Sequence, residues 1–196
     1  MLIIGLTGVS GSGKGYVCAI FERYGIPSVN SDRIVHEIYE RSAECIGELR
    51  SAFGDGIVED TGSVDRKALG RIVFSDRKLL DQLNGIVHKY VIEELNGIIS
   101  DLEAKGNKAV IIDAPQLFEA GVDRMCDRVI SVIAGRETRI ARICKRDGVD
   151  RGAALARISK QHTDRYFRNR SDYIISNNGE DVEEQVRTIL TSLKLI

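Results

Sequence analysis

The chain has 196 residues, of which 43% are hydrophobic, so one domain, with or without an inserted piece, can bury its own core without a disulfide framework. Its 28 lysines and arginines offset 29 acidic residues, giving a formal net charge of -1 and no reason to expect a nucleic-acid partner. Four scattered cysteines without a Cys-x-x-Cys pair indicate reduced thiols and a cytoplasmic location.

The chain begins with a predicted strand and a glycine-rich loop. Residues 2–6 form a short apolar run, which is typical of a strand buried on both faces and too short for a membrane span. Residues 8–14, here named the phosphate loop, read Gly-Val-Ser-Gly-Ser-Gly-Lys and match the pattern Gly-x-x-x-x-Gly-Lys before an amphipathic helix. Its N–H groups and Lys14 would therefore hold the phosphates of a nucleoside triphosphate.

The position after Lys14 departs from that pattern, which has a Ser or Thr whose hydroxyl contacts Mg²⁺. Gly15 and then Tyr16 occupy these places, so no side chain at position 15 can bind the metal. Glycine at this place also occurs in adenylate-kinase-type loops, which this loop resembles. We therefore expect Mg²⁺ to be held by the nucleotide, by waters and by a carboxylate; a weakened or inactive enzyme is the competing interpretation. The residues predicted to bind ATP here are Gly11, Ser12, Gly13, Lys14, Gly15 and Tyr16.

Two acidic residues follow predicted strands and are candidates for chemistry. A second strand is expected over residues 26–29, with Asp32 opening the helix after it, and Asp113 ends a strand over 109–112. Carboxylates at this edge of a parallel sheet can act as a general base or support Mg²⁺ through water. The pattern alone favours a structural role equally. Ser31 or Asp32 would then be the N-cap of the helix, and Asp113 a turn residue at the end of its strand.

From about residue 65 to 106 the apolar positions follow helical spacing, with one apolar face. His88 lies on that stretch beside Val87 and Val91. A histidine in such a setting is more often structural than catalytic, and none of the three histidines belongs to a metal-ligand pattern.

The remaining elements indicate an α/β fold with a mainly parallel, five-stranded sheet, because strands alternate with helices. The last two strands are expected over 128–133 and 173–175, and helices over 136–146, 151–161 and 182–193.

A basic segment follows the fourth predicted strand. Arg139, Arg142 and Arg146 are spaced three and four apart, so a helix would present them on one face. For any single arginine a solvated side chain paired with an acid such as Glu137 or Asp147 is favoured. For the segment as a whole, residues 136–170, we expect a lid that closes over the triphosphate and excludes water.

The order of these motifs resembles the dephospho-CoA kinase family nearly end to end. The resemblance also has two departures: Asn30 replaces the first acid of an Asp-Ala-Asp corner, and Lys89 replaces a proline after His88. In chain order, the matching positions are 5–14, 30–32, 62–69, 83–88, 113–119, Arg142, 146–148, Arg157, Gln161 and 175–179.

The resemblance implies a three-layer P-loop kinase fold that transfers the γ-phosphate of ATP, with Mg²⁺, to the ribose 3′-hydroxyl of dephospho-CoA, the last step of coenzyme A synthesis. It makes Asp32 the preferred general base, with Lys14 and Arg142 as charge stabilisers. Asn177 would lie at the ATP base, and Asp32 and His88 would contact the acceptor.

The resemblance also divides the chain by function. One domain, 1–196, would have its core at about 1–64, 107–135 and 171–196. The acceptor-binding helical region would be about 65–106 and the lid about 136–170. We expect a monomer or weak homo-oligomer, without nucleic acid or membrane. Two alternatives stay open: another nucleoside monophosphate or small-molecule P-loop kinase, and a nucleotide-binding module that has lost catalysis.

Overall fold

The computed structural model describes residues 1–196, and they form two compact units. The first consists of Met1–Val29 with Glu103–Ile196, and the second of Asn30–Leu102. The second unit therefore begins well before residue 65, where we placed the start of the helical acceptor region. Its early start has a local cause, since the N–H of Val64 donates to the carbonyl of Tyr39 at 3.0 Å and ties the preceding helices to this unit.

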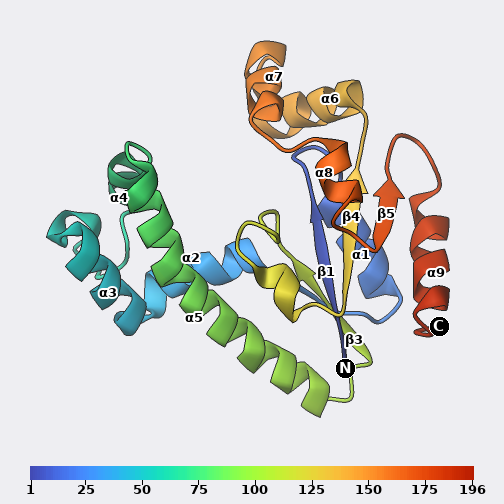
Figure 1. The fold of residues 1–196 in the computed structure, drawn as a ribbon, viewed down its shortest axis with the longest axis horizontal. Coiled ribbons are helices and arrows are strands. Elements are labelled where there is room, and N and C mark those ends of the chain that lie inside the picture. The colour runs from blue at the N-terminus through green and yellow to red at the C-terminus, as the bar shows by residue number, and fades with distance from the viewer. The chain divides into compact units, whose positions relative to one another are not determined.

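The first unit is built on a five-stranded sheet of order β2-β3-β1-β4-β5 (Figure 1). β1 pairs in parallel with β3 and β4, and β4 pairs in parallel with β5. The register places Leu6 opposite Asp113, so the end of β3 lies beside the end of β1. The predicted parallel sheet is confirmed, with strands at Leu2–Gly8, Ser28–Asn30, Ala109–Asp113, Arg128–Ile133 and Tyr173–Ser176.

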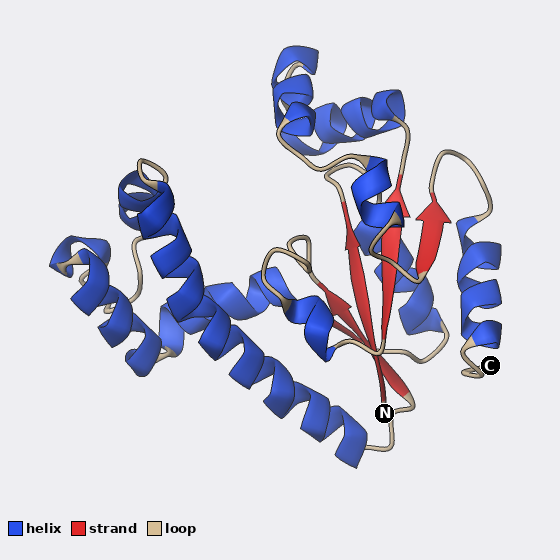
Figure 2. Ribbon diagram, in the orientation of Figure 1, coloured by secondary structure: helices blue, strands red, loops and turns tan.

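Helical segments lie on both faces of this sheet (Figure 2). α1 and α9 pack on one face, where Phe21 and Leu190 are fully buried with the side chains of β1. Burial of each such side chain stabilises the fold by about 1.5–3 kcal/mol. On the other face Leu117 packs against Gly5 of β1. The elements of this unit are α1 Lys14–Arg23, η2 Val122–Met125, α6 Arg136–Asp147, α7 Arg151–Ser159, α8 Asp164–Arg168 and α9 Val182–Ser192.

The second unit is helical. Its longest element, α5, has 28 residues and buries Val87, Val91 and Leu95, which confirms the predicted apolar face. The helix α3 was not predicted from the sequence. The elements are α2 Ser31–Arg41, α3 Ala43–Phe53, η1 Asp55–Ile57, α4 Arg66–Val73 and α5 Arg77–Ala104.

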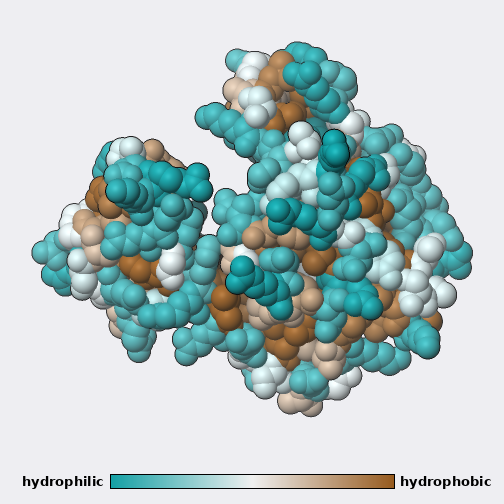
Figure 3. Space-filling view, viewed as in Figure 1, coloured by the Kyte–Doolittle hydropathy of each residue, from teal (hydrophilic) through white to brown (hydrophobic).

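The predicted lid segment contains α6, α7 and α8. Ile140, Ile143 and Ala154 form a small apolar core between α6 and α7. The space-filling view shows apolar surface among hydrophilic side chains in this region (Figure 3). Across the whole chain, no helix has both the length and the apolar character needed to cross a bilayer.

Candidate active site

The phosphate loop connects the end of β1 to the first residue of α1 through glycines that other residues cannot replace freely. Gly11 has a φ of +81°, and a Cβ there would lie 2.8 Å from the carbonyl oxygen of Arg139. Gly13 is the N-cap of α1 with a φ of +92°, and a Cβ there would overlap the Asn177 side-chain amide. The glycine pattern thus serves two needs, a left-handed backbone and close approach of neighbouring segments.

The N–H groups of the phosphate loop fall into two sets. Those of Ser10 and Ser12 donate within the protein, to Gln161 Oε1 at 3.2 Å and to the Val9 carbonyl at 3.1 Å. Those of Gly11 and Gly13 donate to no protein acceptor. Those of Lys14 and Gly15 lie in the first turn of α1, where an N–H has no partner within the helix. The second set is therefore available to an anion, and the positive end of α1 favours one there.

Lys14 forms a salt bridge with Asp113, the last residue of β3. Both side chains are nearly buried, with exposed fractions of 15% and 9%. The adjacent Cys18 thiol reports on these surroundings. Its pKa is raised to about 12, mainly because the thiol is buried and secondly because of the negative charge of Asp113. Asp113 is therefore more than a turn residue, because its carboxylate lies at the phosphate loop.

Arg142 and Asn177 bind the carbonyl side of the same loop. Arg142 Nη1 donates to the carbonyls of Gly11 and Ser12 at 3.2 and 3.1 Å, and its Nη2 donates to Asn177 Oδ1 at 3.0 Å. Asn177, which is 7% exposed, donates from Nδ2 to the Ser12 carbonyl at 2.8 Å. Both predicted residues therefore lie at the loop, whereas contact of Asn177 with the ATP base stays a prediction.

The three arginines on one face of α6 have different surroundings. Arg139 is buried, and burial lowers the pKa of its guanidinium. It donates to the Ser10 carbonyl at 3.0 Å and to Gln161 Oε1 at 2.7 Å, so the solvated role favoured for single arginines is wrong for Arg139. The solvated role is confirmed for Arg146, which pairs with Asp147 and lowers the pKa of that carboxyl to about 2.

Sequence reasoning missed the contribution of Arg139 to this site. Its spacing matches that of Arg142 and Arg146, and spacing does not distinguish a buried arginine from an exposed one. The one signal in the sequence is Gln161, which belongs to the family's lid pattern and binds Arg139 in the structure.

The residues at the loop offer few ligands for a metal ion. Asp113 is the carboxylate paired with Lys14, Gly15 has no side chain, and no group of three or more His, Cys, Asp or Glu side chains occurs anywhere in the chain. The Ser12 hydroxyl is buried without a hydrogen-bond partner. This donor set does not form a protein cage, but it suits Mg²⁺ that arrives with a nucleotide and keeps its waters.

Asp32 lies in the first turn of α2, in the helical unit, and is exposed. The N-cap of α2 is Asn30, whose Oδ1 accepts from the N–H of Arg33 at 2.9 Å. The predicted N-cap at Ser31 or Asp32 is therefore wrong, because the preceding residue already fills that role. The carboxylate of Asp32 is not needed as the cap.

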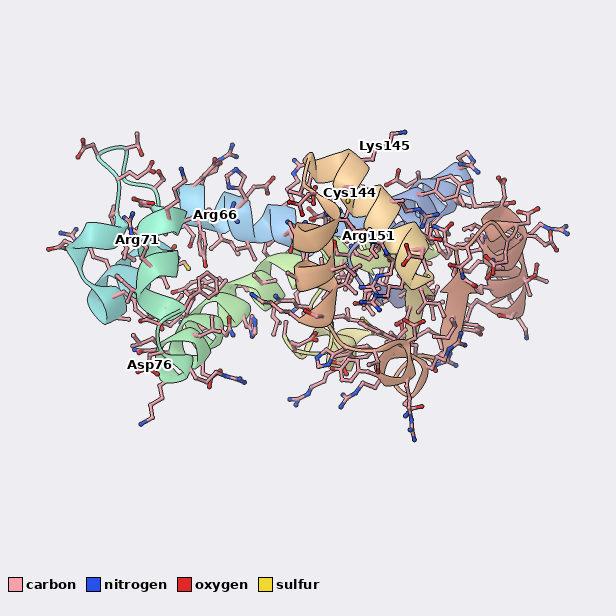
Figure 4. All side chains as sticks on the ribbon, turned by 90° about the horizontal axis from the view of Figure 1, so that it is seen from above. Arg66, Arg71, Asp76, Cys144, Lys145 and Arg151 are labelled. Atoms are coloured by element: carbon pink, nitrogen blue, oxygen red, sulfur yellow. The ribbon has the colours of Figure 1, made fainter.

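His88 lies half-buried on α5, and burial lowers the pKa of its imidazole. No metal-ligating cluster surrounds it. On α4 of the same unit Arg66 and Arg71 are exposed, and Figure 4 shows both projecting from that helix.

A Gly-x-x-x-x-Gly-Lys loop between the first strand of a parallel sheet and a helix, with a strand-end carboxylate on its lysine, defines a P-loop kinase. The family model described as dephospho-CoA kinase matches residues 2–183. The dephospho-CoA kinase of Bacillus licheniformis is 35% identical over 191 residues, covering 96% of this chain and 95% of the relative. That of Fusobacterium nucleatum is 36% identical over 188 residues, covering 95% of each. The chain belongs to the dephospho-CoA kinase family.

Solved structures share the fold of this chain. A Thermus thermophilus protein has a TM-score of 0.81 at 33% identity, over 100% of this chain and 97% of that one. A dephospho-CoA kinase from Campylobacter jejuni has a TM-score of 0.70 at 24% identity, over 97% and 96%, and supports the fold. The chain is therefore a kinase, a phosphotransferase that acts on a hydroxyl group, and the predicted family and fold class are confirmed.

Proposed function

We propose that this chain binds Mg²⁺-ATP at the phosphate loop and transfers the γ-phosphoryl group to the ribose 3′-hydroxyl of dephospho-CoA, giving coenzyme A and ADP. The observation that carries the proposal is the loop itself: four N–H groups are available to phosphate beside the Lys14–Asp113 pair, in a chain of this family. The family assignment favours this reaction over another small-molecule kinase and over a module without catalysis.

Asp32 is the proposed general base. It takes the proton of the 3′-hydroxyl as the new bond between that oxygen and the γ-phosphorus forms, while the bond from the γ-phosphorus to the bridging oxygen breaks and ADP leaves. Asn30 supports this role by capping α2, which leaves the Asp32 carboxylate free for the acceptor. Asp32 also follows β2, the strand next to β3 in the sheet.

Lys14 and Arg142 are the proposed charge stabilisers. Lys14 would exchange Asp113 for the outer phosphates, since an ammonium group binds either anion. The Nη groups of Arg142 donate to the loop carbonyls and to Asn177. We therefore assign it two effects: it fixes the loop and it places a positive charge next to the nucleotide.

Mg²⁺ bound with ATP would supply positive charge that offsets the charge of the phosphates. Of the chain's own residues, Asp113 would accept hydrogen bonds from the waters around the ion, and Asp32 is the second carboxylate proposed for this role. Gly15 contributes no ligand, so the protein holds this ion through fewer direct bonds than a loop with Ser or Thr at that position.

The helical unit is the proposed acceptor site, with its centre in the predicted region 65–106. Exposed basic residues on α4, Arg66, Lys67 and Arg71, can bind the pyrophosphate of dephospho-CoA. His88, half-buried on α5, would contact the acceptor. The lid role of residues 136–170, a monomeric or weakly oligomeric state, the absence of a nucleic-acid partner and a cytoplasmic location all stay predictions.

A coupled assay of ADP release tests the proposal. Dephospho-CoA with ATP and Mg²⁺ should give ADP, whereas coenzyme A, whose 3′-oxygen already carries phosphate, should give none. AMP and shikimate serve as further acceptors, and Lys14→Met is the control for contaminating kinases. ADP release with AMP or shikimate alone would favour another kinase, and ATP binding without transfer to any acceptor would favour a module that has lost catalysis.

A further inference from the structure

The lid segment binds both backbone polar groups of Ser10 in the phosphate loop. The N–H of Ser10 donates to Gln161 Oε1 at 3.2 Å, and its carbonyl accepts from Arg139 Nε at 3.0 Å. Arg139 Nη2 also donates to Gln161 Oε1, at 2.7 Å. The three residues therefore form a closed set of hydrogen bonds, in which one amide oxygen receives two donors.

The two residues that hold Ser10 come from different parts of the lid segment. Arg139 lies on α6 and is 6% exposed, whereas Gln161 follows the end of α7. The backbone of Arg139 also lies against Gly11, where a Cβ would be 2.9 Å from its Cα. Figure 4 shows α6 and α7 side by side, with Lys145 of α6 pointing outward.

Burial of a guanidinium is costly unless its donors are satisfied. Arg139 donates from Nε to the Ser10 carbonyl and from Nη2 to the Gln161 amide, both neutral acceptors, and the acid that acts on its charge, Asp164, forms no salt bridge with it. The position of Arg139 suits a group that fixes the loop and leaves the anion site itself to other donors.

We propose that Arg139 and Gln161 are positioning residues for ATP. By binding the N–H and the carbonyl of Ser10, they keep the N–H turned to Gln161 and fix the conformation in which the N–H groups of Gly11, Gly13, Lys14 and Gly15 receive the phosphates. They also link the lid helices to the loop, so the arrangement of α6 and α7 affects nucleotide affinity. This proposal rests on the binding of ATP to the phosphate loop.

Two variants at Gln161 separate acceptor chemistry from side-chain volume. Gln161→Met keeps the length but removes the oxygen, leaving the donors of Ser10 and Arg139 unpaired, whereas Gln161→Glu keeps an acceptor oxygen. We expect Gln161→Met to raise the dissociation constant for ATP, measured by calorimetry without acceptor, about tenfold, as the loss of two hydrogen bonds implies. Gln161→Glu should stay within about threefold of the wild type.

Steady-state kinetics provide the second measurement. In Gln161→Met the KM for ATP should rise, while the KM for dephospho-CoA should change less than about twofold. Lys145→Met is the matched control, because Lys145 is an exposed residue of α6 that points away from the loop. It should bind ATP as the wild type does.

The proposal is overturned if Gln161→Met binds ATP as tightly as the wild type, if Gln161→Glu loses affinity equally, or if both KM values rise together. Should Gln161→Met fail to fold in a thermal-unfolding control, Arg139→Lys tests the contact with the Ser10 carbonyl, since lysine keeps the charge but loses the planar fork whose two nitrogens bind Ser10 and Gln161. Its dissociation constant should rise in the same way, and an unchanged value would also overturn the proposal. A wild type that binds no ATP would instead contradict the proposed function.

Discussion

Lys14, the first residue of α1, and Asp113, the last residue of β3, form a salt bridge with both side chains nearly buried. The register of β1 and β3 creates this pair, because it places Asp113 opposite Leu6, just before the loop. The lysine expected to bind phosphate thus has an anionic partner within the protein, and ATP must compete with Asp113 for it. That competition would release the carboxylate for the waters around Mg²⁺.

Asp113→Asn tests the carboxylate of this pair. The Mg²⁺ concentration that gives half-maximal activity should rise about tenfold, because an amide binds the waters of the ion less strongly. The unfolding free energy should fall by about 1–3 kcal/mol, since the buried Lys14 loses its charged partner. Metal titrations and urea unfolding measure the two effects. Asp101→Asn, at an exposed position of α5, should change neither, and an unaltered metal requirement in Asp113→Asn would remove Asp113 from the metal's surroundings.

Asp32→Asn tests the general base. Turnover should fall about 10²- to 10⁴-fold, the usual contribution of a positioned base, while ATP affinity measured by calorimetry stays the same. Asn30→Ala is the matched control, because it removes the helix cap at a cost of about 1 kcal/mol in stability and should reduce turnover far less. Wild-type turnover in Asp32→Asn would contradict the role of Asp32.

Gly15→Ser restores the hydroxyl that the loop pattern has at this position. A Cβ at Gly15 would have no heavy atom within 4 Å, so the serine fits without displacing a neighbour. The half-maximal Mg²⁺ concentration should fall about three- to tenfold, since one protein ligand replaces a water. Gly47→Ser, on α3 and equally open, should raise helix stability without any effect on the metal. If the two variants respond to Mg²⁺ alike, Gly15 does not face the ion.

Arg66→Gln tests the acceptor role of the helical unit. Loss of this exposed charge on α4 should raise the KM for dephospho-CoA about tenfold and leave the KM for ATP unchanged, because the guanidinium is assigned to the acceptor's pyrophosphate. Arg77→Gln, at the start of α5 with Asp81 as its partner, is the control. A rise in both KM values, or in neither, would place the acceptor elsewhere.

His88→Gln tests how the lowered pKa of the half-buried histidine affects stability at acid pH. Because burial lowers the pKa of His88 below its usual 6.5, the unfolded chain takes up the proton more readily than the folded one, and stability falls as pH drops below about 6.5. The variant removes this loss, so its melting temperature should decline less than that of the wild type between pH 7 and pH 5. Parallel declines would show that His88 does not contribute to acid sensitivity.

Much of the fold followed from local patterns. The buried strand over 2–6, the phosphate loop with its lysine and the helix after it are each encoded within a few neighbouring residues, by apolar runs, glycines and helical spacing. The same holds for the apolar face of α5. The N-cap of α2 is a local feature that was predicted wrongly, because Asn30, Ser31 and Asp32 all favour that position and only the backbone decides which one caps.

By itself the sequence determined that this chain is a P-loop kinase with the motif order of its family, and it identified Lys14, Arg142 and Asn177 for the site. Only the tertiary structure decided what surrounds them: that Asp113 pairs with Lys14, that Asn177 and Arg142 bind the loop carbonyls, and that Arg139 is buried while Arg146 is solvated. The physical reason is that helical spacing fixes which face a side chain occupies, whereas its depth and its partners depend on the segments packed against that face, which are distant in the chain.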